Sequence, residues 1–472
     1  MLRTILTLTL LTSLTHGSES LIIHEWGTFT SLQDPQGRTI GGINTDEEPL
    51  PHFVHDLLPF FLRPHGDLAP VFVKISPRLA PNITMRLETP VVYVHVPPGA
   101  KLDPFTLSVS FTGGILSQFY PLAEPTVNGE PVSLRSQRLL PPISADTRSS
   151  LTWHGIKTGT QVDGPETTSP VWIAPRQIAA ARLTVGNEHE RYLFYRGLGQ
   201  LDAPFIVSQK NDQLAVNVRK LTAPHQQTVT TIPDLWLVDI RPNHSVAFRH
   251  IAGQATPQIN NTSSVFTEDA YSTTSLSALK KDMHSALVAD GLFADEAHAM
   301  LATWEASYFQ APGMRLFFLL PRAWTDHYLP LTLSRPAQIN RVMMGRIELM
   351  TKNHQVALAR ISKGPISRGD WWQAAQKKHI YKMDGKTIEY HPGGQELQIK
   401  LEIEQYNHGV LRANNIQVPD DYQAYLDLGR FRDAILMHQQ RITSQDNIAL
   451  FIKTYLHAPG QLQAAINPVA TP

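Results

Sequence analysis

Histidine and carboxylate side chains gather near the start of the chain, and these residue types bind divalent metals or activate water. His24 and Glu25 directly follow the apolar run Leu21-Ile22-Ile23, and His52 and His55 lie three residues apart in a segment rich in acidic residues and prolines. Imidazole nitrogens suit zinc and similar metals, and the chain has no cysteine to offer a thiolate instead. We therefore predict His24, His52 and His55 as ligands of a divalent metal such as zinc. The alternative for the His52 segment is a surface loop.

Two carboxylates are candidates for the catalytic base beside such a metal. Glu25 is the neighbour of His24, and Glu88 follows Arg86 by two residues, just ahead of an apolar strand. Neighbouring residues on a strand point to opposite faces, so His24 and Glu25 enter one site only where a bulge intervenes. Two structural alternatives stay open: an N-terminal strand anchored by Trp26, and an ion pair between Arg86 and Glu88.

Aromatic, acidic and basic residues meet again in the second half of the chain. Trp304 precedes a glutamate, and Arg322, Trp324 and Asp326 lie within five residues of one another. Exposed tryptophan beside charged groups suits recognition of a glycan or a peptide. We therefore predict Trp304, Arg322, Trp324 and Asp326 as substrate-binding residues. Buried aromatic packing is the alternative.

Composition and motifs exclude several classes of function. The chain has neither a Gly-x-Ser-x-Gly elbow nor a phosphate-binding loop of the Walker type. Its 41 basic and 41 acidic side chains balance without a basic stripe, so a nucleic-acid partner is not expected. Beyond the first segment, no apolar run approaches the roughly 20 residues that cross a bilayer, so no membrane insertion is expected once that segment is removed.

The first twenty residues have the pattern of an export signal. Arg3 precedes an apolar run at 5–14, and the small residues of Thr15-His16-Gly17-Ser18 follow it. We expect residues 1–20 to be a signal peptide. Because exported eukaryotic proteins of this size often use disulfides, a chain without cysteine favours a periplasmic or secreted bacterial protein.

The elements that must position these side chains change character along the chain. Residues 21–252 contain short β-branched or aromatic runs separated by turn clusters such as Pro97-Pro98-Gly99. This texture predicts a domain with an antiparallel β-sandwich. The polar stretch 253–274 is the expected linker. The predicted strands lie at 21–23, 71–73, 91–94, 107–111, 192–195, 235–240 and 246–251.

Residues 275–472 are predicted to form a mixed α+β domain. Leu279, Met283 and Leu287 recur at helical spacing until Gly291, and Asp295 can cap a second helix. Further strands are expected at 316–320, 329–333, 342–350 and 397–403, and helices near 422–439 and 447–457. The predicted fold class is therefore mainly β, with helices confined to the second half.

Several strings spread over the chain resemble a family of exported bacterial proteins that is recognisable by a His-Glu-Trp-Gly-Thr-Phe-Thr opening. The resemblance spans nearly the whole chain, so it implies one co-folded unit and an exported bacterial protein, and it assigns no catalytic residue. The strings are His24 to Ser31, Glu47-Glu48-Pro49-Leu50-Pro51, Phe53-Val54-His55, Glu88-Thr89-Pro90, Phe194-Tyr195-Arg196-Gly197, Leu320-Pro321-Arg322-Ala323-Trp324-Thr325-Asp326 and Leu428-Gly429-Arg430-Phe431.

Two functions of different class follow from these patterns. The first is a metal-assisted hydrolase that acts on an extracytoplasmic small molecule, glycan or peptide, with Glu25 or Glu88 as the base. The second is a non-catalytic periplasmic or envelope-associated binding protein, in which Trp304 and Trp324 line the recognition surface. Convergence of His24, His52 and His55 on one point would favour the enzyme.

Overall fold

The structure is a computed structural model. It describes residues 21–46, 50–57, 63–64, 80–134, 142–220, 229–364, 382–383, 386–387 and 420–455. Strands predominate, and nearly all their pairings are antiparallel, so the prediction of a mainly β protein is confirmed at this level. The expected signal peptide and the expected strands at 71–73 and 397–403 lie outside the described residues.

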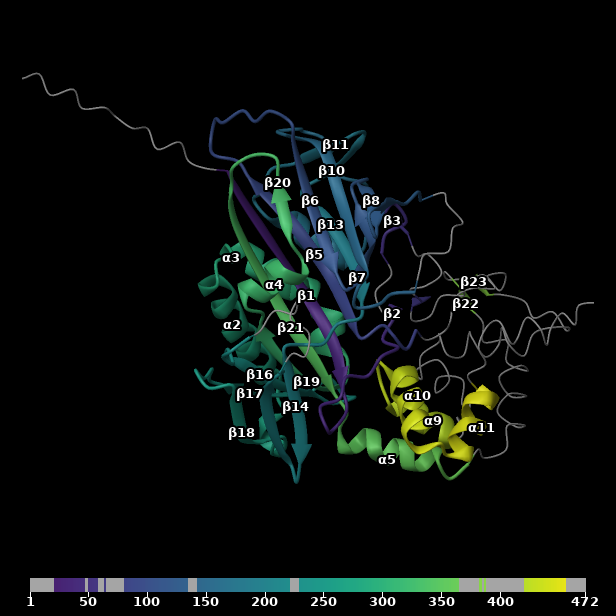
Figure 1. Cartoon of the computed structure of the whole chain (residues 1–472). Helices are drawn as coiled ribbons and strands as arrows, with labels where there is room; N and C mark the ends of the chain where they lie inside the picture. Colours follow the sequence, from purple (N-terminus) through teal and green to yellow (C-terminus); the bar gives the residue numbers. More distant parts are fainter. Residues whose placement is uncertain are drawn as a thin grey trace, which may run out of the picture.

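A nine-stranded sheet forms the centre of the molecule (Figure 1). Its central strand β1 pairs in parallel with β21 on one side and antiparallel with β5 on the other. In spatial order the strands are β17 (Val246–Ile251), β16 (Leu235–Ile240), β19 (Gly313–Leu319), β21 (Gln338–Leu349), β1 (Ile22–Gln33), β5 (Met85–His95), β13 (Leu193–Gly199), β7 (Gly114–Tyr120) and β3 (His55–Asp56).

A second, seven-stranded sheet shares an apolar core with the first. Phe29 and Val92 of the large sheet belong to the same buried cluster as Leu107 and Trp153 of the second sheet. The second sheet consists of β12 (Glu188–Glu190), β11 (Leu183–Val185), β10 (Arg148–Thr158), β6 (Phe105–Thr112), β20 (Leu331–Leu333), β8 (Glu124–Val127) and β9 (Glu130–Pro131). A three-stranded sheet contains β14 (Phe205–Lys210), β15 (Gln213–Val218) and β18 (Gln258–Ser263), and short pairs are formed by β2 (Thr45–Asp46) with β4 (Arg63–Pro64) and by β22 (Lys382–Met383) with β23 (Lys386–Thr387).

Helices cover the other face of the large sheet. Leu279 and Met300 pack in one cluster with Trp26 of β1 and Val342 of β21. Gly291 follows the end of α2 as expected, with a φ of 115°, and Ser272 accepts a hydrogen bond from the first turn of this helix. Asp295 is not the cap predicted for the next helix, because the N-cap of α3 is Phe293 and Asp295 lies in the first turn. The helical elements of this layer are α1 (Pro170–Ile173), η1 (Ala174–Gln177), α2 (Thr273–Ala289), α3 (Ala294–Thr303) and η3 (Glu305–Gln310), whereas η2 (Glu268–Ala270) packs against the core that the two sheets share.

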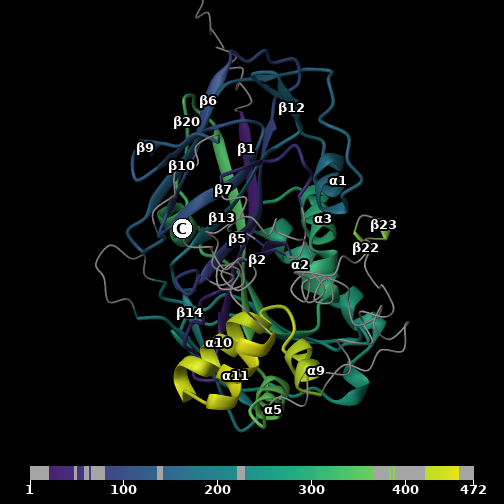
Figure 2. The same ribbon diagram turned by 90° about the vertical axis from the view of Figure 1, so that its right-hand side faces the viewer.

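The last helices form a further group at one end of the large sheet, seen at the bottom of Figure 2. α5 packs against α9, and their apolar side chains join those of α10 in a cluster that includes Leu358, Tyr425 and Leu436. The helix predicted near 422–439 is instead two helices, Asp420–Asp427 and Arg432–Thr443, with Gly429 between them at a φ of 71°, and the helix predicted near 447–457 is confirmed as far as residue 455. The elements are α5 (Lys352–Ile361), α9 (Asp420–Asp427), α10 (Arg432–Thr443) and α11 (Asp446–Tyr455), while α4 (Arg322–Tyr328) lies near β6 and β21.

The expected boundary at 253–274 does not separate two sheets. The large sheet takes β1, β5 and β13 from before this segment and β19 and β21 from after it. The segment itself contains β18 and η2. Its polar composition reflects a strand whose side chains are mostly exposed, rather than a linker.

No helix among the described residues combines the length and the apolar character that a bilayer crossing requires.

Candidate functional site

His24 and Glu25 enter different environments because they lie on opposite faces of β1. The His24 ring contacts Glu296 of α3, on the helix-covered face. The Glu25 carboxylate accepts hydrogen bonds from Arg341 and from the hydroxyl of Tyr195. The ladder between β1 and β5 shifts only further along, between Trp26 and Thr28, so no bulge brings the two side chains together.

Three strands and one helix position the group around His24. His24 is opposite Tyr93 in the ladder with β5, and His95 lies two residues further along β5 on the same face. Asn340 of β21 is in register with His24 on the other side. Glu296 reaches down from the first turn of α3. We call His24, His95 and Glu296 the histidine cluster.

The three side chains of the histidine cluster are in direct contact. The Nδ1 atom of His24 lies 2.6 Å from Oε2 of Glu296, and Nε2 of His95 lies 2.9 Å from Oε1. Glu296 is fully buried, and the side chains of His24 and His95 are 1% and 12% exposed. The ring of Phe293 packs against both imidazoles, with centroid distances of 4.5 and 4.8 Å.

Glu296 is held as a carboxylate in this site. Burial alone would raise its pKa, but hydrogen bonds from His24 and His95 and from the backbone N–H of Phe293 keep the pKa of Glu296 below its usual range. The position in the first turn of α3 adds to this effect, because the N-terminal end of a helix favours negative charge.

The histidine cluster has the donor set of a divalent metal site. One nitrogen of each histidine and one carboxylate oxygen lie within 4.8 Å of one another, and no other such group occurs in the described part of the chain. Zinc bonds to nitrogen and oxygen are about 2.0–2.2 Å long, so a bound ion would replace the two hydrogen bonds after small side-chain rotations. The amide nitrogen of Asn340 donates to Nε2 of His24 at 2.9 Å. With a metal on Nδ1, a flipped Asn340 amide would accept from Nε2–H and orient the ring.

His52 and His55 do not join His24, so the predicted ligand set is wrong. Nε2 of His55 lies 2.9 Å from a carboxylate oxygen of Glu188, and the exposed His52 packs beside Phe53. His55 belongs to β3 at the edge of the large sheet, and β5, β13 and β7 lie between that strand and β1. The spacing of His52 and His55 therefore reflects an edge segment and not a shared ligand sphere.

Neither predicted catalytic base is available as a base. Glu25 is fully buried against Arg341 and faces away from the histidine cluster. Glu88 contacts Arg86 and Arg430 and accepts hydrogen bonds from Thr30 and Tyr308 at 2.8 and 2.7 Å.

The charge of Glu88 is fixed by its surroundings. Burial alone would raise its pKa, but Arg430, Arg86 and Arg346 hold the pKa of Glu88 well below its usual range. A carboxylate stabilised in this way is a poor proton acceptor at neutral pH. Its sequence neighbour Arg86 is one of its partners, as the structural alternative predicted.

The two tryptophans predicted to recognise a substrate are buried. Trp304 stacks on Tyr308 at a centroid distance of 4.8 Å, and Trp324 makes an edge-to-face contact with Phe29 at 5.0 Å. They are 1% and 2% exposed. The alternative of buried aromatic packing therefore holds for both tryptophans, because their large rings fill the core. Arg322 and Asp326 do lie at the surface, where they pair with each other.

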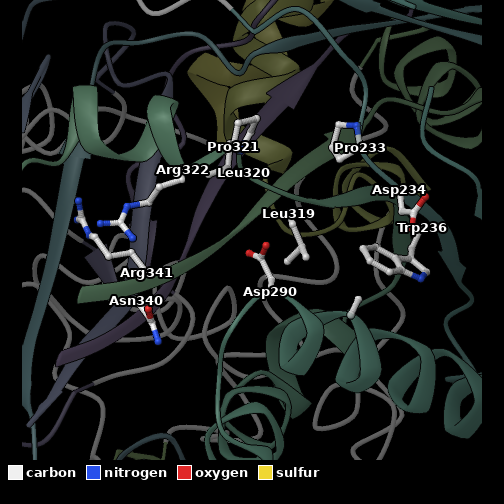
Figure 3. Close-up of a pocket in the computed structure, with 11 residues that line it drawn as sticks. Pro233, Asp234, Trp236, Asp290, Leu319, Leu320, Pro321, Arg322, Asn340 and Arg341 are labelled. Atoms are coloured by element: carbon white, nitrogen blue, oxygen red, sulfur yellow. The ribbon is translucent and has the colours of Figure 1, made fainter. Parts of the chain in front are cut away.

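A pocket of about 530 Å³ adjoins the histidine cluster (Figure 3). Asn340 connects the two, because it lines the pocket and also contacts Nε2 of His24. The pocket is lined by Pro233, Asp234, Trp236, Ala286, Asp290, Leu319, Leu320, Pro321, Arg322, Asn340 and Arg341.

Three residues of this site were not found from the sequence. His95 directly follows the predicted strand 91–94, and Glu296 is next to the predicted cap Asp295. Asn340 has no chemical signal of its own. Strand alternation could have placed His95 on the face of Tyr93, but the pairing of β5 with β1 was needed to bring it to His24.

Comparisons with known proteins do not assign a family. No family model and no curated protein matches the chain. Among solved structures, the mu-homology domain of yeast delta-COP-I with a bound peptide has 8% identity and a TM-score of 0.24, covering 70% of this chain and 98% of that one. The Fcho1 mu homology domain of Danio rerio with a bound peptide has 9% identity and a TM-score of 0.24, covering 71% and 97%. At such scores the likeness supports no conclusion about fold or function.

Proposed function

We propose that the protein is an exported metal-assisted hydrolase whose divalent metal, such as zinc, is bound by His24, His95 and Glu296. The observation that carries the proposal is the convergence of two imidazoles and a carboxylate beside a pocket large enough for a small molecule. Three protein ligands leave a coordination position open, as in catalytic zinc sites.

The chemistry proposed for this site is attack of water on an ester, amide or phosphoester bond. His24, His95 and Glu296 would hold the ion, and a zinc ion there would supply an acidified water as the nucleophile, so no dedicated carboxylate base would be needed. Asn340 would orient His24, and Phe293 would shield the ligands from bulk solvent. This assignment replaces the roles first predicted for Glu25 and Glu88.

The setting of the proposed activity comes from the sequence. The pattern of residues 1–20 supports export to the periplasm or the medium of a bacterium, where the substrate would be met. The resemblance to exported bacterial proteins supports the same location. We further interpret the two sheets that share an apolar core as a sandwich-like scaffold, which keeps the faces of β1 and β5 fixed.

The second candidate is a non-catalytic binding protein of the periplasm or envelope. The ion pairs of Glu25 and Glu88 with arginines favour this second function, because they give both predicted catalytic bases a structural role. In this version the histidine cluster fastens α3 to the sheet by hydrogen bonds alone. The pocket, and not the buried tryptophans, would be the recognition surface.

Metal content distinguishes the two functions. We expect untagged protein to retain about one equivalent of zinc or manganese after dialysis, and Glu296→Gln and His95→Asn to lose it. Glu296→Gln is the sharper variant, because an amide oxygen can still accept from the N–H of Phe293 while being a weaker ligand. His55→Asn is the matched control, since it removes a half-buried histidine that also pairs with a glutamate.

The result that overturns the metal site is wild-type protein without metal affinity, or variants that bind as well as wild type. Thermal unfolding of each variant separates loss of metal from loss of fold. Hydrolysis of nitrophenyl esters, phosphodiesters and peptide anilides is then measured with and without chelator. Metal retention without hydrolysis of any of these substrates would favour the binding protein.

A further inference from the structure

We infer that the pocket beside the histidine cluster binds a ligand that carries a positively charged group on an apolar body, with Asp290 as the anchoring carboxylate. The inference deepens the proposed function, because such a ligand would be the substrate class of that site. Binding itself requires neither the metal nor catalysis, so the two can be tested apart.

The walls of the pocket are suited to the apolar part of a ligand. Trp236, Leu319, Pro321 and Pro233 line the space; Figure 3 shows Pro233 and Trp236 at the right of the view, with Leu319 and Pro321 nearer its centre. The volume of about 530 Å³ lies within the range typical of sites for small organic molecules. An aromatic or aliphatic group would be desolvated between these side chains.

The cationic side chains of the pocket are already compensated. Arg322 makes two hydrogen bonds to Asp326, of 2.9 and 2.7 Å. Arg341 pairs with Glu25 and, at 2.8 Å, with Asp326. Figure 3 shows the two guanidinium groups beside each other, at one side of the view. An anionic ligand would have to compete with these carboxylates.

The two acidic residues of the pocket differ in their hydrogen-bond and ion-pair partners. Asp234 accepts a hydrogen bond from the backbone N–H of Gly253 at 2.6 Å and lies 3.6 Å from His250. Asp290 is exposed, and its carboxylate makes no hydrogen bond or ion pair with any residue that the structure describes; Arg322 is the cation that acts on it from a distance. Figure 3 shows its carboxylate directed between Leu319 and Asn340.

The position of Asp290 is fixed by the end of α2. It is the C-terminal cap of that helix, and Gly291 then turns the chain with a φ of 115°. A Cβ at Gly291 would lie 3.9 Å from the side chain of Asn340, so this turn runs directly over the residue that contacts His24. A cation held by Asp290 would therefore leave the rest of the ligand at the Asn340 end of the pocket.

The four charged residues of the lining cancel, but Arg322 and Arg341 are also paired with Asp326 and Glu25. Counted with these partners, the two arginines add no net charge, and the carboxylates of Asp234 and Asp290 remain. Burial raises the pKa of Asp290, and Arg322 is the cation that opposes this rise. An ammonium or guanidinium group supplied by a ligand would give the carboxylate a partner of its own. A basic amine, or the side chain of lysine or arginine in a peptide, has this chemistry together with an apolar stem.

The test uses three probes that share one apolar body: phenethylamine, phenethyl alcohol and hydrocinnamate. Their binding to chelator-treated, full-length mature protein is measured by calorimetry. We expect the amine to bind about tenfold more tightly than the alcohol, and hydrocinnamate to bind more weakly than either, as a charge-assisted hydrogen bond predicts. Asp290→Asn should reduce the affinity for phenethylamine to that for phenethyl alcohol, and it should leave the affinity for the alcohol unchanged.

Asp295→Asn is the matched control, because it removes the same charge close by on α3 but outside the pocket lining. It should retain the preference for the amine. Equal binding of the three probes, or a preference for the amine that survives Asp290→Asn, overturns the inference. Because the measurement is made without metal, loss of the metal site in Glu296→Gln would leave this result unchanged.

Discussion

Glu25 and Arg341 form an ion pair inside the core, with side chains that are 0% and 1% exposed. The sequence predicts His24 as a ligand and Glu25 as a base, with an N-terminal strand anchored by Trp26 as the structural alternative. Their burial changes what a substitution should do, because removing one member of a buried pair leaves the other charge uncompensated. Glu25 of the opening motif is therefore a structural residue.

We predict that Glu25→Ala lowers the free energy of unfolding by about 3–5 kcal/mol. The loss arises because Arg341 keeps only the half-exposed Asp326 as a charged partner. Urea unfolding at neutral pH measures it. Asp163→Ala is the control: it removes the exposed partner of Arg182 and should change stability by less than about 1 kcal/mol. Equal losses in the two variants would contradict the prediction.

The sequence was informative about single residues only where chemistry and local spacing coincide. His24, predicted as a ligand, lies in the histidine cluster, and the opposite orientation of Glu25 follows from strand alternation alone. Whether Trp304 and Trp324 are exposed could not be read from composition, because the same aromatic residue serves a surface or a core. The ion pair of Glu88 with Arg86 was among the alternatives, but its second partner Arg430 could not be found because it lies 342 residues away in the sequence.

Among the elements, β1 depends on a close approach of backbone at Gly27. A Cβ there would lie 2.9 Å from Cα of Pro90, at the point where the ladder between β1 and β5 shifts. The neighbouring Thr89 has a φ of 46°. The glycine of the opening motif thus lets two strands meet at an irregularity that Thr89 and Pro90 create.

We predict that Gly27→Ala destabilises the protein by about 2–3 kcal/mol, since inserting a methyl group against backbone forces the strands apart. Gly99→Ala is the comparison: it has a φ of 76° and nothing within 4 Å, so only the conformational cost of about 1 kcal/mol applies. Thermal and urea unfolding of both variants measure the difference. A smaller effect at Gly27 than at Gly99 would show that the strands adjust freely.

Element types were predicted better than their partners. The runs at 91–94, 107–111, 235–240 and 316–320 fall in β5, β6, β16 and β19, and the helical spacing ending at Gly291 is α2. The pairing of β1 with β21 was not predictable, because nothing in the local sequence of either strand indicates which strand it pairs with. That pairing brings Asn340 to His24 and Arg341 to Glu25, so the site could not be assembled from the sequence alone.

At the scale of the whole molecule, Glu88 joins the large sheet to the last group of helices. It lies on β5, and Arg430 lies between α9 and α10. Its pKa in the folded protein is far below the value of 4.5 for the free side chain. A group with a lowered folded pKa contributes stability above its unfolded pKa, and this contribution is lost as the pH falls towards the folded pKa.

We predict that stability decreases as the pH falls below about 5, and that Glu88→Gln makes this decrease shallower while lowering stability at neutral pH. Urea unfolding at neutral pH and at about pH 3.5 measures both effects. Glu124→Gln, which removes an exposed partner of His154, should keep the wild-type pH dependence. An unchanged slope in Glu88→Gln would mean that other carboxylates dominate acid unfolding.

The parallel pairing of β1 with β21 also affects when the large sheet can be completed during synthesis of the chain. The two strands are in register although His24 and Asn340 are 316 residues apart, so one edge of β1 stays without its neighbour until nearly three quarters of the chain has been synthesised. Contacts of such long range make folding slow, because a large loop must close before they form. A nascent chain would meanwhile expose an apolar, aggregation-prone strand edge, which chaperones would have to protect.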